Sequence, residues 1–122
     1  MKVVIVEDER TILDMYRFKF ELAKFEVFTA LNGEEGLQVI EKEMPDAVLL
    51  DIRMPVMSGD EMLREMRGTE WGEKIPVIVL TNISRDEAPR TLWHLGVSDY
   101  IVKAHSTPQM IVEKVQKILS EK

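Results

Sequence analysis

The feature that most constrains the fold is the stretch from Ala47 to Gly59, which reads AVLLDIRMPVMSG. Its first four residues, Ala47 to Leu50, are apolar without polar alternation, a pattern typical of a strand buried on both faces of a parallel sheet. Asp51 follows directly and is expected at the carboxyl end of that strand, where open α/β sheets bind ligands. Pro55 and Gly59 indicate the turn that follows. The sequence therefore predicts an α/β fold with a carboxylate at the ligand-binding edge of its sheet.

Similar apolar runs recur along the chain and alternate with segments of helical periodicity. The expected strands are 3–6, 26–29, 47–50, 77–80 and 97–102, and the expected helices are 10–23, 34–42, 57–66, 84–95 and 107–120. This alternation indicates a parallel sheet with helices on both faces. In the helix expected at 84–95, Pro89 is placed in the first turn, where proline is tolerated. A length of 122 residues without a linker or repeat predicts one domain, residues 1–122.

Composition excludes several classes of function. The chain has no cysteine, which excludes disulfides, thiolate catalysis and cysteine-ligated zinc. A net charge of −6 argues against a general nucleic-acid binder, because phosphate backbones require clustered Lys and Arg. The longest apolar run is far too short to cross a bilayer. We therefore expect no direct nucleic-acid or membrane partner, and a cytoplasmic location as the default.

The carboxyl ends of parallel strands meet at one edge of a sheet, and here they carry polar residues. The first expected strand leads into Glu7 and Asp8, and the third, fourth and fifth lead into Asp51, Thr81 and Lys103. Each residue alone has a simpler explanation, such as a helix cap or a solvated strand end, but their common edge favours a site. Clustered carboxylates without His or Cys favour a hard cation such as Mg²⁺. A carboxylate beside such an ion can act as a nucleophile toward phosphorus.

Four motifs carry a family resemblance: VEDE at 6–9, LLDIRMPVMSG at 49–59, VIVLT at 77–81 and DYIVK at 99–103. On these motifs the chain resembles the receiver domain of two-component response regulators, of the single-domain, chemotaxis-regulator-like kind. The resemblance implies a flavodoxin-like (βα)5 three-layer sandwich whose parallel five-stranded sheet has the order 2-1-3-4-5. It also implies a phosphorylation-dependent signalling switch, not an enzyme, with self-catalysed phosphotransfer and autodephosphorylation as its only reactions.

The resemblance assigns roles to the residues at the acidic edge. It implies that Asp51 is the phospho-acceptor, and that Asp8 and Asp51 are the carboxylates that bind Mg²⁺. The backbone carbonyl of Arg53 is expected as a third protein ligand. Glu7 is expected as an accessory acid that acts through a water. The phosphoryl donor is expected to be a phosphohistidine on a sensor histidine kinase or a histidine phosphotransfer protein.

The switch itself is expected to involve three further residues. The resemblance implies that Thr81 binds the phosphoryl group, that Lys103 pairs with its oxygens, and that Tyr100 turns inward when Thr81 moves. The altered surface is expected to be the helix at 84–95, the strand at 97–102 and the last helix. A downstream protein partner, unidentified by the sequence, is expected to bind there. The chain is expected to be a monomer or a phosphorylation-dependent homodimer.

Other readings of the same residues remain open. A Mg²⁺-dependent phosphatase with an aspartyl nucleophile uses the same groups, but such enzymes usually carry a second Asp two residues after the nucleophile, where this chain has Arg53. A degenerate receiver that acts only as an interaction module is the second alternative. One departure from the family pattern is Ala104 after Lys103, where most receivers have proline. We expect either a trans bond with an altered loop or a strained cis bond, since a cis bond before a non-proline residue is unfavourable.

Overall fold

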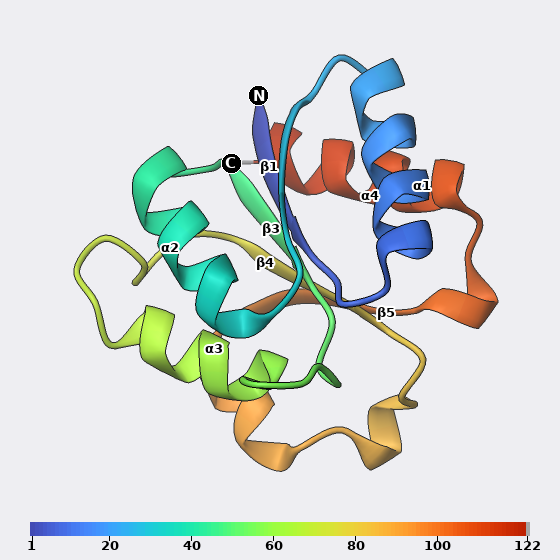
Figure 1. Ribbon diagram of the computed structural model, residues 1–122. Helices are drawn as coiled ribbons and strands as arrows, with labels where there is room; N and C mark the ends of the chain where they lie inside the picture. The colour runs from blue at the N-terminus through green and yellow to red at the C-terminus, as the bar shows by residue number, and fades with distance from the viewer. Residues whose placement is uncertain (122) are drawn as a thin grey trace.

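The computed structural model describes residues 1–121 and contains one five-stranded parallel sheet (Figure 1). Its order, β2-β1-β3-β4-β5, is the order expected for a flavodoxin-like fold, and the prediction is confirmed. All four pairings between neighbouring strands are parallel. The strands are β1 (Lys2–Val6), β2 (Glu26–Ala30), β3 (Ala47–Leu50), β4 (Val77–Thr81) and β5 (Val97–Val102).

Helices cover both faces of the sheet and form the outer layers of a three-layer sandwich. The α-helices are α1 (Arg10–Leu22), α2 (Gly33–Glu43), α3 (Gly59–Arg67) and α4 (Pro108–Ser120). Figure 1 shows α1 and α4 on one side of the sheet and α2 and α3 on the other. Among residues 1–121, no helix combines the length and the apolar character needed to cross a membrane.

Two hydrophobic cores, one on each face, follow from the alternation of side chains along the central strands. In β1, Val4 and Val6 pack with residues of α2 and α3, whereas Val3 and Ile5 pack with residues of α1 and α4. All four residues of β3 are buried. Because both faces are covered, β1, β3 and β4 read as uninterrupted apolar runs, which is why the sequence pattern located them.

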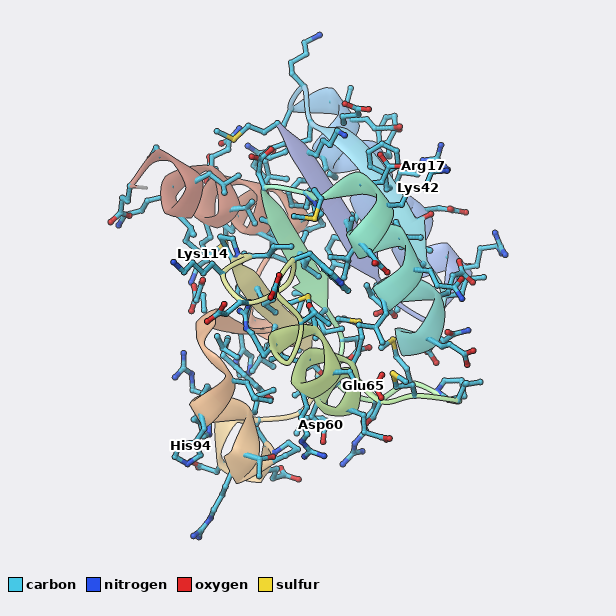
Figure 2. All side chains as sticks on the ribbon, turned by 90° about the vertical axis from the view of Figure 1, so that its left-hand side faces the viewer. Arg17, Lys42, Asp60, Glu65, His94 and Lys114 are labelled. Atoms are coloured by element: carbon cyan, nitrogen blue, oxygen red, sulfur yellow. The ribbon has the colours of Figure 1, made fainter. Side chains whose placement is uncertain are left out.

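Helix boundaries follow local capping chemistry. The Asn32 side chain accepts a hydrogen bond from the backbone N–H of Glu35 at the start of α2. Thr107 caps α4 in the same way, and Pro108 is its first residue, as the sequence predicts. In α3 the apolar residues Met62, Leu63 and Met66 are buried, while Figure 2 labels Asp60 and Glu65 among the polar side chains of the same helix.

The helix predicted at 84–95 is wrong. The chain instead forms two short 3₁₀ helices, η1 (Arg85–Glu87) and η2 (Arg90–Leu95). Between them Ala88 is extended, with φ −68° and ψ 148°. Proline disfavours a helical backbone at the residue before it and has no N–H to donate, so Pro89 separates the two pieces instead of occupying a first turn. Gly96, at φ 73°, ends η2 in a left-handed conformation.

The far end of this connection is tied to α3 by Arg67. Its guanidinium donates hydrogen bonds to five backbone carbonyls, those of Gly72, Glu73, Ile75, Leu95 and Gly96, at 2.7 to 3.4 Å. Burial lowers the pKa of Arg67 below its usual value of 12.5. One side chain therefore joins the end of α3, the loop before β4 and the end of η2.

Candidate functional site

A polar cavity of about 350 Å³ lies at the carboxyl ends of the strands. Six of the seven residues that the sequence places in the site line this cavity, and Tyr100 does not. The lining residues are Glu7, Asp8, Glu9, Ile12, Asp51, Arg53, Thr81, Asn82, Ile83, Glu87 and Lys103. They come from the last residue of β4 and from the segments that follow β1, β3, β4 and β5, so the parallel sheet brings together residues that are far apart in the sequence.

Backbone contacts fix Asp51 at the end of β3. Its N–H donates to the carbonyl of Val6, at 3.1 Å, which ties the two central strand ends together. On the other side, the N–H of Gly59 donates to the carbonyl of Ile52, at 2.7 Å. A Cβ on Gly59 would overlap the carbonyl oxygen of Asp51 and lie 2.8 Å from the Cα of Ile52. The start of α3 therefore packs directly on the backbone that carries Asp51, and only glycine fits there.

The loop between β3 and α3 contains a tight turn at Val56. The N–H of Met57 donates to the carbonyl of Pro55, at 2.9 Å, the pattern of a three-residue γ-turn. Val56 is its central residue, with φ 71°, a left-handed value that is unfavourable for a β-branched residue. Its side chain is 77% exposed, so no packing compensates for this strain.

Three carboxylates form an acidic cluster within the cavity. One oxygen from each of Glu7, Asp8 and Asp51 lies within 4.8 Å of the others. Glu7 and Asp51 are buried, at 3% and 8% exposure, whereas Asp8 reaches solvent. An all-oxygen donor set that is open to water on one side fits a hard divalent cation such as Mg²⁺, which retains several waters when it binds to proteins.

Lys103 reaches across the sheet and pairs with two of these acids. Its ammonium nitrogen lies 2.7 Å from Glu7 Oε2 and 3.1 Å from Asp51 Oδ2. Burial raises the pKa of Glu7 to about 7; the hydrogen bond from Lys103 opposes the rise, and the neighbouring Asp51 adds to it. Burial alone would lower the pKa of Lys103, but its hydrogen bond to Glu7 and the charges of both carboxylates raise it. The ammonium is thus held charged beside Asp51.

The segment after β5 differs from the family pattern, because Ala104 and not proline follows Lys103. Residues 1–121 contain no cis peptide bond, so the bond between Lys103 and Ala104 is trans. The chain turns instead through a short 3₁₀ helix, η3 (Lys103–His105). Of the two expected outcomes, the structure has the trans bond with an altered loop. The loop still directs the Lys103 side chain into the acidic cluster.

Thr81 and Tyr100 are connected through the backbone of Ile83. Thr81 is 1% exposed, and its Oγ1 accepts a weak hydrogen bond of 3.4 Å from the Ile83 N–H. Tyr100 is already turned inward, at 5% exposure, and its hydroxyl donates to the Ile83 carbonyl at 2.6 Å. Tyr100 therefore lies outside the cavity but contacts the chain segment that forms one of its walls.

These features can be compared with known proteins. Residues 3–116 match the family model described as "Response regulator receiver domain". The chain belongs to this family. Receiver domains are the signalling switches of two-component systems, where they interact with histidine kinases and downstream effectors. The carboxylate cluster at the strand ends of this receiver domain is compatible with Mg²⁺ binding.

A curated relative of the receiver domain is the phosphate regulon transcriptional regulatory protein PhoB of Rhizobium meliloti (strain 1021). The two are 36% identical over 112 residues, which cover 90% of this chain and 48% of PhoB. The chain thus spans about half the length of that relative.

Solved structures share the whole fold. The chemotaxis protein CheY4 of Vibrio cholerae is 28% identical with a TM-score of 0.88, covering 96% of this chain and 97% of its own. A putative response regulator from Chloroflexus aurantiacus J-10-fl is 31% identical with a TM-score of 0.87, and the match covers 98% of this chain and 97% of that protein's chain. The BeF3-activated N-terminal receiver domain of RstA from Klebsiella pneumoniae is 28% identical with a TM-score of 0.86, covering 98% of each chain.

Sequence reasoning did not place two acids that line the cavity of the receiver domain, Glu9 and Glu87. The sequence does indicate a place for Glu9 at the cavity, because this residue continues the acidic run after β1. No sequence feature indicates that Glu87 lines the cavity. Its position depends on the interruption of the helix at Pro89, whereas the sequence predicts a continuous helix there.

Proposed function

We propose that Asp51 accepts a phosphoryl group from a phosphohistidine on a sensor histidine kinase or a histidine phosphotransfer protein. The observation that supports this most strongly is the position of its carboxylate, which is buried at the end of β3 within 3.1 Å of the Lys103 ammonium and beside the oxygens of Glu7 and Asp8. The charge and the oxygen donors needed for phosphoryl transfer are thus arranged around one nucleophile.

The transfer forms one bond and breaks one bond. An oxygen of Asp51 attacks phosphorus while the bond from phosphorus to the imidazole nitrogen breaks, and the electron pair of that bond stays on the nitrogen. The Lys103 ammonium offsets the negative charge of the phosphoryl oxygens, and the Thr81 hydroxyl donates a hydrogen bond to one of them. Mg²⁺ would be held by Asp8, Asp51 and the Arg53 carbonyl, with Glu7 acting through a water, and would supply further charge neutralisation.

The output of the switch is assigned to the surface formed by η1, η2, β5 and α4. Phosphorylation adds up to about two negative charges beside Thr81 and Lys103 and draws both side chains inward. Because Ile83 joins Thr81 to Tyr100, this movement reaches β5 and alters the surface for a downstream protein partner. We infer a single receiver domain over residues 1–122. We also infer that the protein is cytoplasmic and that it is a monomer or a phosphorylation-dependent homodimer. We infer that it acts as a switch and not as an enzyme with turnover.

Intact-mass measurement after incubation with acetyl phosphate and Mg²⁺ tests the proposal. One phosphoryl adduct is expected on the wild-type protein and none on Asp51→Asn. Asp14→Asn is the matched control, because Asp14 is an exposed acid on α1, and it should accept the phosphoryl group normally. Steady release of phosphate over many turnovers would identify a phosphatase instead. Absence of both adduct and Mg²⁺ binding would leave only an interaction module.

A further inference from the structure

Tyr100 holds the chain segment that separates β4 from η1. Its hydroxyl donates to the carbonyl of Ile83 at 2.6 Å and lies 3.4 Å from that of Ser84. Ile83 also lines the cavity that contains Asp51. A movement of this segment toward Asp51 must therefore carry Tyr100 with it or break a buried hydrogen bond, which is unfavourable. The position of Tyr100 is thus physically coupled to the shape of the cavity.

The Tyr100 ring lies close to the side chains of Trp93 and Arg85. The centroids of the two aromatic rings are 5.3 Å apart and their planes are inclined at 47°. The guanidinium carbon of Arg85 lies 5.6 Å from the centroid of each ring. A cation at this distance is attracted to both aromatic rings. Arg85 therefore favours the arrangement in which the Tyr100 and Trp93 rings are in contact and Tyr100 is inside.

Asp99 orients Arg85. One of its carboxylate oxygens lies 3.7 Å from Arg85 Nη2 and accepts a hydrogen bond from the backbone N–H of Tyr100. The ammonium nitrogen of Lys114, a residue of α4 that is labelled in Figure 2, lies 3.8 Å from the other carboxylate oxygen of Asp99. The Arg85 side chain is 61% exposed, so its ion pair with Asp99 contributes little by itself. Its effect is to keep the guanidinium over the rings.

We propose that Arg85 is a positioning residue that holds Tyr100 inward and thereby strengthens the response of the site to phosphorylation. This inference rests on the proposed phosphorylation of Asp51. The contacts around Arg85 come from η1, η2, β5 and α4, and Asp51 takes part in none of them. They stabilise the arrangement in which the Ile83 carbonyl is bound by Tyr100. A contact that stabilises the conformation preferred by the phosphoryl group raises the affinity for that group by the factor by which it raises the population of that conformation.

The test compares Arg85→Met, which keeps the length but removes the charge, with Arg85→Lys, which keeps the charge. Arg90→Met is the matched control, because Arg90 is an exposed arginine of η2. The proteins are labelled with 3-fluorotyrosine and followed by ¹⁹F NMR, with and without beryllofluoride and Mg²⁺. The chain has two tyrosines, and Tyr16→Phe assigns the signal of Tyr100. Thermal unfolding shows that each variant is folded.

Without beryllofluoride, the Tyr100 signal of Arg85→Met should move toward that of an exposed tyrosine, and beryllofluoride should return it to the wild-type position. Its affinity for beryllofluoride should be roughly two- to fivefold lower, the change expected from the loss of an exposed cation from an aromatic site. Arg85→Lys should retain most of both properties and Arg90→Met all of them. An unchanged Tyr100 signal in folded Arg85→Met would overturn the inference. Failure of the wild-type protein to bind beryllofluoride would instead contradict the proposed function, and the Tyr100 signal of the free protein would still test Arg85.

Discussion

Replacement of Glu7 by Gln should remove much of the pH dependence of stability between about pH 5 and about pH 7. Glu7 is 3% exposed and lies beside Asp51, with Lys103 as its hydrogen-bond partner. Its pKa is raised from 4.5 to about 7, chiefly because burial disfavours the charged form. In this pH range the folded protein therefore binds a proton that the unfolded chain has released.

The direction in which stability changes with pH follows from this difference in bound protons. Glu7 contributes stability that is fully present below its unfolded pKa of 4.5 and is lost as the pH rises to about 7. The pKa change corresponds to about 3 kcal/mol of folding free energy, at about 1.4 kcal/mol for each pKa unit. Because Gln cannot ionise but can still accept a hydrogen bond from Lys103, Glu7→Gln should be more stable than wild type at neutral pH by an amount approaching this figure.

Urea unfolding in EDTA at a series of pH values measures this effect. The unfolding free energy of Glu7→Gln minus that of wild type should rise steadily across the range and level off above about pH 7.5. Glu41→Gln is the control, because Glu41 is an exposed acid of α2, and its curve should run parallel to that of wild type. If the Glu7→Gln curve is also parallel, Glu7 is ionised in the folded protein throughout the range from about pH 5 to about pH 7, and the reasoning is refuted.

Two further substitutions test the loop that leads from Asp51 to α3. Gly59→Ala should destabilise the protein by about 1–3 kcal/mol, because the new methyl group overlaps the Asp51 carbonyl, and it should slow phosphorylation by acetyl phosphate. If Gly59→Ala has the unfolding free energy and the phosphorylation rate of the wild-type protein, the close packing of Gly59 on the Asp51 backbone is contradicted. Val56→Asn should raise the unfolding free energy by about 1 kcal/mol, because Asn tolerates the left-handed backbone and the exposed Val side chain buries little surface. Urea denaturation measures both stabilities, and a loss of stability in Val56→Asn would refute the assignment of strain.

The sheet and its polar edge could be predicted because both depend on simple regularities. Runs of apolar residues located the central strands, and parallel pairing required that Asp51 and Lys103 be at the same edge, although they are far apart in the sequence. The pairing of Lys103 with Glu7 could not be predicted, because these residues follow strands that are not neighbours in the sheet. Only the length and direction of the Lys103 side chain brings them together.

The connection from β4 to β5 was predicted less well, for two physical reasons. Leu92 and Leu95 suggest helical periodicity, but the effect of Pro89 on Ala88 outweighs it, so two 3₁₀ pieces form. Arg67 had no sequence signal at all, since its partners are backbone carbonyls, which every residue possesses. Side chains that bind the backbone leave no complementary residue in the sequence to mark their partners.

The five carbonyls that Arg67 binds also determine how the β4–β5 connection can move. With Leu95 and Gly96 held against α3, the connection is attached at its end, and the hydrogen bond from Tyr100 to the Ile83 carbonyl attaches it at its start. Displacement of the chain must then be taken up between these two attachments, within η1 and η2. A shift of Ile83 at the acidic edge is therefore accommodated by rearrangement of η1 and η2, while the residues next to β5 keep their place against α3.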